Sequence, residues 1–307
     1  MSESTHALSG RQLRLDYDNY TACIATVGAS LRELAWRGRP LVRPFAADEL
    51  RPVFSGALLA PWPNRVVDGR YSYNGREQRL ALSEPARGHA LHGLSLWNDF
   101  EVIESGPARA VLATVIEAQD GYPHRVRVRV EYTLDARGLT TLATATLLGG
   151  EPAPFGWGSH SYLCAPGEQS RWTLTVPARR VQHTVGERLL PDEVLPAAGT
   201  ELDFASPRQI GETFIDHAYT ELVRDDAGLA HVDLTAPGGV GVRMSWGREL
   251  GWVQLHTADR PEPELNRTGL AVEPMTCPPG AFNSGVDVIR LEAAAPATAS
   301  WRITALG

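Results

Sequence analysis

The chain of 307 residues contains no lysine, so arginine carries all of its fixed positive charge. The absence of lysine excludes catalysis through a lysine Schiff base. Cysteine is also scarce, because Cys23, Cys164 and Cys277 are the only three and none is spaced as Cys-x-x-Cys. We therefore expect neither a disulfide framework nor a structural zinc knot.

Long hydrophobic runs are missing as well. No stretch approaches about 18 uninterrupted apolar residues, the length at which a membrane-spanning helix is considered. The first residues, 1–6, have neither a basic start nor a long apolar run, so we expect no signal peptide. A cytoplasmic location is the default expectation for such a chain.

The chain also lacks an excess of positive charge. Its formal net charge is −7 at pH 7, whereas a nucleic-acid surface requires clustered positive charge. The same balance gives no reason to expect attraction to anionic membranes. We therefore expect neither nucleic acid nor membrane as a partner.

Helical periodicity is absent, and the dominant period is two. In residues 126–134, Val, Tyr and Leu alternate with Arg, Glu and Thr, which indicates a strand with one buried face. A turn at 135–138 and a threonine-rich stretch at 139–147 predict a hairpin, and residues 231–235 and 240–246 repeat the pattern. The 29 Gly and 22 Pro residues are scattered between such runs. The pattern predicts an all-β protein, an antiparallel sandwich or barrel.

No shift in composition divides the chain. Residues 1–10 are expected to form a loose N-terminal tail. Residues 11–307 are expected to form a single domain, since a chain of this length can bury one large all-β core. Residues 191–207 are predicted to be a long ordered loop.

Glu273 follows the apolar run 270–272 and precedes Pro274. A residue before proline is biased toward extended geometry, so the sequence predicts a carboxylate at a strand end. A carboxylate held there can act as a general base. The alternative is a solvated glutamate with no chemical role.

His160 lies between Ser159 and Ser161 in a segment rich in glycine and aromatic residues. Histidine donates or accepts a proton near neutral pH, which makes it a candidate acid or base. A structural histidine bonded to backbone is the alternative. A serine-hydrolase arrangement is not expected, because adjacent residues of a strand point to opposite faces, and no Gly-x-Ser-x-Gly elbow is present.

His89 and His92 form a His-x-x-His pair. The pair lacks the following glutamate and the helical context of metalloprotease motifs, so a metal site is the weaker interpretation and none is predicted. A histidine that hydrogen-bonds a ligand hydroxyl is the better interpretation of His92.

Arg65 and Asp216 are candidate ligand-binding residues. A guanidinium offers a rigid fork of donors for neighbouring hydroxyl oxygens, and a carboxylate can accept from hydroxyls. Their alternatives are an exposed arginine and a turn residue that closes a strand. Trp62, Trp157 and Trp252 could provide stacking faces for a sugar, or could simply belong to the core.

The order of these residues is more specific than any one of them. The series resembles the aldose 1-epimerase (galactose mutarotase-like) family over nearly the whole chain, and the segments concerned are Asn64-Arg65, Leu91-His92-Gly93, His160-Ser161-Tyr162, Asp216-His217 and Glu273. The resemblance implies a large antiparallel β-supersandwich. It also implies a mutarotase, an isomerase that interconverts the α and β anomers of a free hexose without a cofactor. The partner would be a monosaccharide, and the protein a monomer or a homodimer.

The resemblance also assigns roles to the candidate residues. Glu273 would be the general base that takes the proton from the C1 hydroxyl, and His160 the general acid that protonates the ring oxygen. Arg65, His92 and Asp216 would hold the sugar hydroxyls. An ionised Glu273 and a protonated His160 would give activity a bell-shaped dependence on pH.

Two departures leave the substrate open. Galactose mutarotases of this family carry Asn where this chain has Ser159, and Thr-Gln where Pro274 and Met275 follow Glu273. One alternative is an epimerase of an anionic hexose, such as sulfoquinovose or a hexose 6-phosphate, which would require an additional converging arginine. A second is a sugar-binding module without catalysis. A third is a glycoside hydrolase, which requires two carboxylates, with Asp216 as the second.

Overall fold

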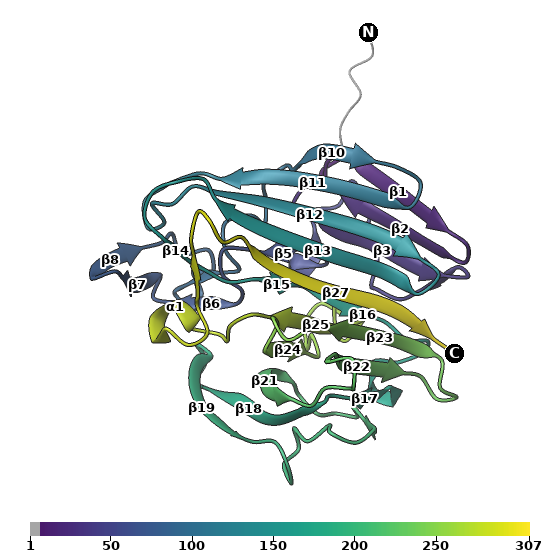
Figure 1. Ribbon diagram of the computed structural model, residues 1–307. Coiled ribbons are helices and arrows are strands. Elements are labelled where there is room, and N and C mark those ends of the chain that lie inside the picture. Colours follow the sequence, from purple (N-terminus) through teal and green to yellow (C-terminus); the bar gives the residue numbers. More distant parts are fainter. Residues whose placement is uncertain (1–6) are drawn as a thin grey trace.

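The computed structural model describes residues 7–307, which fold almost entirely into antiparallel β-strands (Figure 1). In Figure 1 the largest sheet forms a curved layer from the top of the molecule to its lower right. Its nine strands lie in the order β10 (Glu101–Ser105), β11 (Arg109–Ile116), β12 (Val126–Asp135), β13 (Gly138–Leu147), β27 (Ala297–Leu306), β23 (Gly241–Trp246), β22 (Ala230–Thr235), β17 (Thr173–Thr175) and β20 (Arg208–Gln209).

A second large sheet has eight strands. Seven of them lie in the order β19 (Leu190–Pro196), β18 (Ala178–Val185), β21 (Asp216–Leu222), β24 (Trp252–His256), β25 (Leu270–Met275), β15 (Gly158–Ser159) and β5 (Leu58–Leu59). The eighth, β16 (Ser161–Leu163), pairs with β25 beside β15. Strand β25 therefore has β24 on one side and two short strands on the other.

Smaller sheets and short helices complete the fold. The strands are β1 (Gln12–Tyr17), β2 (Tyr20–Ala25), β3 (Ser30–Trp36) and β4 (Arg39–Pro40) in a four-stranded sheet, and the pairs β6 (Arg65–Val67) with β9 (His89–Leu91), β7 (Arg70–Tyr73) with β8 (Arg76–Arg79), and β14 (Ala153–Phe155) with β26 (Ile289–Leu291). The helices are η1 (Pro52–Phe54), η2 (Gln169–Arg171) and α1 (Ala281–Ser284). Within residues 7–307, none of the helices has the length and apolar character needed to cross a membrane.

Alternating side chains explain why the large sheets pack together. In β12 the valines 126, 128 and 130 are fully buried, whereas the arginines between them remain partly or fully exposed. One continuous apolar core includes residues of both large sheets and of the four-stranded sheet, such as Val130, Val272 and Leu34. The all-β prediction and both predicted hairpins, β12–β13 and β22–β23, are confirmed.

Two expectations about irregular segments need correction. The first residues of the chain, 1–6, lie outside the described part, but residues 7–10 of the predicted loose tail are held in place. Ser9 is buried, and its N–H and Oγ donate to the carbonyl of Ala47 at 3.0 and 2.8 Å. The predicted loop 191–207 begins instead as strand β19, because its backbone pairs with β18 at the edge of the eight-stranded sheet.

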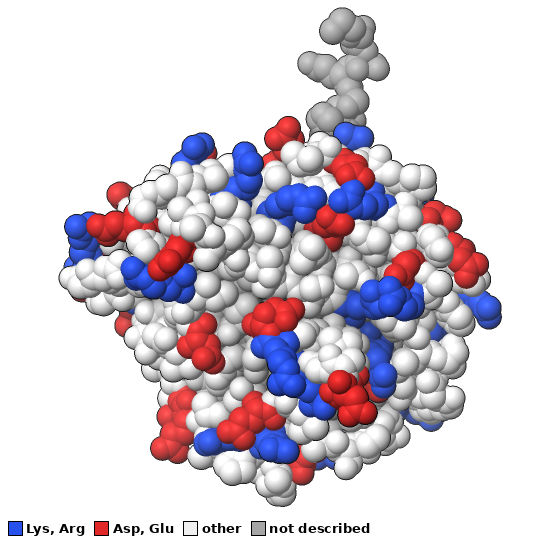
Figure 2. Space-filling model, in the orientation of Figure 1, with Lys and Arg blue, Asp and Glu red and all other residues white. Residues whose placement is uncertain are grey.

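Charged side chains of both signs are interspersed on the face shown in Figure 2. No single-signed stripe runs across that face. Ion pairs between neighbouring strands of the nine-stranded sheet include Arg109 with Glu131 and Arg243 with Asp233. Such a surface offers no continuous track for a polyanion on this side of the molecule.

Candidate active site

A cavity of about 300 Å³ lies at the eight-stranded sheet, with walls from β21, β24 and β25 and from the segments around η1, β6 and β9. Its size is at the lower end of the range for small-molecule pockets. Polar and charged side chains form most of its lining. All five residues predicted as catalytic or substrate-binding border this cavity: Arg65, His92, His160, Asp216 and Glu273.

His160 and Glu273 form the centre of the site. Gly158 pairs with Met275 and Ser161 with Val272, and the shared register places His160 directly opposite Glu273. Cross-strand neighbours in such positions bring their side chains into contact. Accordingly, His160 Nε2 lies 3.4 Å from Glu273 Oε1, with both side chains almost completely buried.

Glu273 lies within β25, not at a strand end as the sequence suggested. The strand continues through Pro274, which pairs with Val253 of β24 on one side. On its other side the same register places Pro274 opposite Ser159, next to the Gly158–Met275 pair. A proline is tolerated in a strand where it does not have to donate a backbone hydrogen bond. The result is a carboxylate fixed by strand pairing both before and after it.

Burial controls the protonation of the central pair. Removal from water lowers the pKa of His160 to about 3 and raises the pKa of Glu273 well above its usual value, with Asp216 adding to the latter effect. The structure therefore favours a neutral imidazole beside a protonated carboxyl. The carboxylate and imidazolium expected from the sequence differ from this state only in the position of one proton. The neutral state is favoured because desolvation disfavours the charged pair.

The pair also has unused hydrogen-bonding capacity. Within residues 7–307, Glu273 Oε2 and His160 Nδ1 are buried without a hydrogen-bond partner. Buried polar atoms are nearly always satisfied, so orphaned atoms in a cavity point to a polar ligand or water. A ligand hydroxyl beside Glu273 would supply a partner for Oε2.

His92 stands beside the central pair in the left-handed conformation, with φ of 62°. Its Nδ1 accepts a hydrogen bond from the Asn64 N–H at 3.2 Å, which leaves the proton on Nε2. The ring contacts His160 edge to face at 5.0 Å, and burial lowers its pKa well below the usual value. His92 is thus a neutral hydrogen-bond donor.

Asp216 is oriented by Gln254. Gln254 Nε2 donates to Asp216 Oδ1 at 2.7 Å, and His256 Nδ1 lies 3.8 Å from the same oxygen. Gln254 pairs with Glu273 across β24 and β25, so both side chains lie on the cavity face of the sheet. Its Oε1 is buried without a partner in the described part of the chain and can accept from a ligand hydroxyl.

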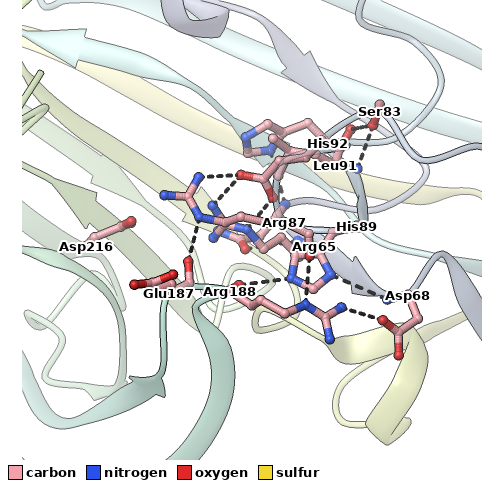
Figure 3. Close-up of polar contacts among 12 residues, drawn as sticks. Arg65, Asp68, Ser83, Arg87, His89, Leu91, His92, Glu187, Arg188 and Asp216 are labelled. Carbon is pink, nitrogen blue, oxygen red and sulfur yellow. Dashed lines mark hydrogen bonds and ion pairs between the residues drawn. The ribbon is translucent and has the colours of Figure 1, made fainter. Parts of the chain in front are cut away.

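Arg65 lies at the start of β6 and borders the cavity (Figure 3). Two nitrogens of its guanidinium already donate hydrogen bonds within the protein. Its Nε and Nη2 donate to the two carboxylate oxygens of Glu84 at 2.7 and 3.0 Å. Burial alone would lower the pKa of Arg65, but the hydrogen bonds and charge of Glu84 outweigh it and raise the pKa. Arg65 therefore remains charged, and Nη1, which has no hydrogen-bond partner among residues 7–307, can bind a ligand.

Other candidates from the sequence lie outside the cavity. His89 is buried, with Nδ1 accepting from the Asp68 N–H at 3.4 Å and Nε2 hydrogen-bonded to the Arg188 carbonyl at 2.9 Å. The three tryptophans 62, 157 and 252 are buried and do not border the cavity. Phe54, Tyr162 and Phe214 border it instead. In the described residues, no three His, Cys, Asp or Glu side chains form a potential metal site.

Several cavity residues were not expected from the sequence. They are Glu84, Gln254, His256, Arg260 and the hydroxyl of Tyr162, which is buried without a partner among residues 7–307. The alternation of β24 could have indicated Gln254 and His256, since every second residue of that strand shares one face. Glu84 and Arg260 follow no periodic pattern, and only the tertiary fold identifies them.

The chain matches the family model described as Aldose 1-epimerase over residues 11–303. It is similar to the Escherichia coli (strain K12) protein YihR, which is described as uncharacterized, with 34% identity over 290 residues, 94% of this chain and 91% of YihR. Human galactose mutarotase is 27% identical over 66% of this chain and 61% of its own length.

Solved structures share the fold. A putative aldose 1-epimerase from Escherichia coli K12 superposes with a TM-score of 0.83 and 20% identity, covering 96% of this chain and 98% of that one. A GalM/aldose epimerase homologue from C. elegans gives a TM-score of 0.85 and 18% identity, covering 97% and 98%. Because the family model covers nearly the whole chain, the protein belongs to the aldose 1-epimerase family.

Proposed function

We propose that the protein is a mutarotase that interconverts the α and β anomers of a free hexose. The observation that carries the proposal is the buried His160–Glu273 pair, with Nε2 and Oε1 3.4 Å apart in a polar cavity. Mutarotation removes a proton from one sugar oxygen and adds a proton to another. A pair that holds a single proton between a carboxylate and an imidazole meets that requirement.

The proposed reaction begins when the shared proton moves from Glu273 to His160. The carboxylate then takes the proton of the C1 hydroxyl, while His160 Nε2 protonates the ring oxygen. The bond between C1 and the ring oxygen breaks, which gives an aldehyde and a free hydroxyl. Rotation about C1–C2 and reversal of the same steps on the other carbonyl face produce the second anomer, with both protons returned.

Arg65, His92 and Asp216 are proposed to hold the hydroxyls of the sugar. Arg65 Nη1 and His92 Nε2 supply donors, and Asp216 supplies an acceptor fixed by Gln254. Uncharged hydroxyls need both donors and acceptors, which this lining provides. The sugar-binding module without catalysis is less well supported, because binding alone gives no reason to bury an acid–base pair.

An anionic hexose is the second candidate substrate, and Arg260 is the observation in its favour. Arg260 borders the cavity, and its Nε is buried without a hydrogen-bond partner in the described residues. Burial is the main cause of the lowered pKa of His160, and the positive charge of Arg260 adds to it. A sulfonate or phosphate group would complement such a guanidinium.

Anomer exchange measured by NMR on the purified protein tests the proposal. Glucose, galactose, glucose 6-phosphate and sulfoquinovose form the panel, each compared with its spontaneous rate in the same buffer. We expect acceleration of at least one sugar. Binding of a panel sugar without any acceleration would favour the sugar-binding module instead.

A further inference from the structure

Glu84 is a partly buried carboxylate in the cavity wall that has no part in the proposed proton transfer. It lies in the turn between β8 and β9, and its side chain is 12% exposed. Both of its oxygens accept hydrogen bonds from Arg65, and Oε1 also accepts from Arg87 Nη1 at 2.8 Å. Figure 3 shows the two arginines, Arg65 and Arg87, together with His92.

We propose that Glu84 is a positioning residue that fixes the guanidinium of Arg65 so that Nη1 points to the sugar. This inference rests on the proposed function. Two parallel N–H···O bonds define the plane and rotation of a guanidinium, which a single contact cannot do. An arginine fixed before binding loses less side-chain entropy when the sugar arrives.

The second arginine extends the same cluster to another element. Arg87 Nε donates to the Glu187 carbonyl at 3.1 Å, and Arg188 Nε donates to the Arg87 carbonyl at 2.9 Å. Residues 187 and 188 belong to the tip of the β18–β19 hairpin, and the next residue, Leu189, borders the cavity. Glu84 therefore connects the sugar-facing arginine to the hairpin that closes one end of the cavity.

The chain offers a matched ion-pair cluster for comparison. On the nine-stranded sheet, Glu131 accepts from Arg109 Nε and Nη2 at 2.9 Å each, and from Arg129 Nη2 at 3.2 Å. Glu131 thus has the same bidentate contact and a second arginine, yet it does not border the cavity. Substitution at Glu131 reports the effect of losing such a cluster without any effect on sugar binding.

The test compares Glu84→Gln with Glu131→Gln. Glutamine has nearly the same shape but only one oxygen, so it cannot hold both donors of Arg65. We expect Glu84→Gln to raise KM for the exchanging sugar about tenfold with a smaller change in kcat, because hydroxyl contacts act in ground and transition states alike. Glu131→Gln should leave both constants unchanged. Equal KM values in the two variants would overturn the proposal.

A second readout is independent of activity. The Arg65 Nε–H signal in NMR of arginine-labelled protein, assigned with Arg65→Met, should broaden or shift in Glu84→Gln and not in Glu131→Gln. An unchanged signal would overturn the positioning role whether or not the protein exchanges anomers. Absence of exchange by the wild type, with a shifted signal, would instead contradict the proposed function alone.

Discussion

The His160–Glu273 pair holds one proton, and burial decides where that proton resides. Each side chain is almost fully enclosed, and the neutral form of each is favoured over its charged form. A sugar hydroxyl or ring oxygen that enters the cavity offers hydrogen bonds to the charged forms, which lowers the cost of moving the proton to His160. The resting protonation and the proposed chemistry are therefore compatible.

The dependence of activity on pH tests this description of the pair. His160 has a pKa of about 3, so it is neutral at higher pH. Glu273 keeps its proton until the pH exceeds its raised pKa. The pair thus holds one proton at pH values between about 3 and the raised pKa of Glu273, and loses its acid form above that pKa. We expect kcat/KM to show no inflection near 6.5, the ordinary histidine value. A clear inflection there would show that a freely titrating histidine controls the rate.

Arg260 provides a test of the charge of the substrate. Arg260→Met should raise KM for an anionic hexose at least about tenfold more than for a neutral one, because only the anion loses a charge-assisted contact. The KM ratio between glucose 6-phosphate and glucose measures the difference. Arg248→Met, at an exposed arginine outside the cavity, is the control. Equal changes for both sugars would remove the support for an anionic ligand.

The sequence was sufficient to find some cavity residues and not others. Glu273 and His160 stand beside recognisable strand and glycine-rich segments, and their order resembles a family pattern. Glu84 and Arg260 lie in irregular segments, where no periodicity relates a residue to a face of the molecule. The protonation of the pair was also not predictable, because desolvation depends on the complete fold around it.

At the scale of elements, strand register brings the central pair together. Strand β25 pairs with β24 from Ala271 to Met275, and with β15 and β16 on either side of His160. The separation of the His160 and Glu273 side chains is thereby fixed by backbone hydrogen bonds rather than by a flexible loop. Displacement of β15 would change the spacing within the pair.

Gly158 offers a way to displace that strand. A Cβ at this position would lie 2.8 Å from Pro63 Cβ and 3.1 Å from Leu59 Cδ1, so Gly158→Ala must shift β15 or its neighbours. We expect a loss of kcat/KM of about 100-fold, as for misplacement of a catalytic group by roughly 1 Å. Gly251→Ala is the control, because nothing lies within 4 Å of its added Cβ. Equal activity of both variants would contradict the link between register and catalysis.

Elements with local pairing were predicted well. Hairpin β12–β13 combines an alternating pattern with a short turn, and both signals lie within about two dozen neighbouring residues. The short strands β15 and β16 carry no such signal, since they pair with β25, and β15 also with β5, both about a hundred residues away in the chain. Strand β19 was mistaken for a loop for another reason: it pairs locally with β18, but its sequence LPDEVLP contains two prolines and no clear alternation of apolar and polar residues.

At the scale of the whole molecule, one continuous core joins the large sheets. Leu112 of the nine-stranded sheet and Val272 of the eight-stranded sheet are both fully buried in it. A shared core couples the stability of the sheets, since neither can lose its packing alone. The prediction of a single domain over residues 11–307 has this physical basis and stays a prediction.

Unfolding by urea tests that prediction. Leu112→Ala should lower the free energy of unfolding by about 2–5 kcal/mol and shift one transition common to fluorescence and circular dichroism. Leu142→Ala, on the exposed side of β13, should change it by less than about 0.5 kcal/mol. Two separate transitions, of which Leu112→Ala shifts only one, would indicate two independent units.

The most direct test of the central claim is anomer exchange by Glu273→Gln. Glutamine reproduces the shape of the protonated carboxyl, so the fold and the cavity should be retained. We predict that this variant melts near the wild-type temperature and loses about 100- to 10,000-fold in exchange rate, the usual contribution of a general base. Exchange at the wild-type rate by a correctly folded Glu273→Gln protein would contradict the account.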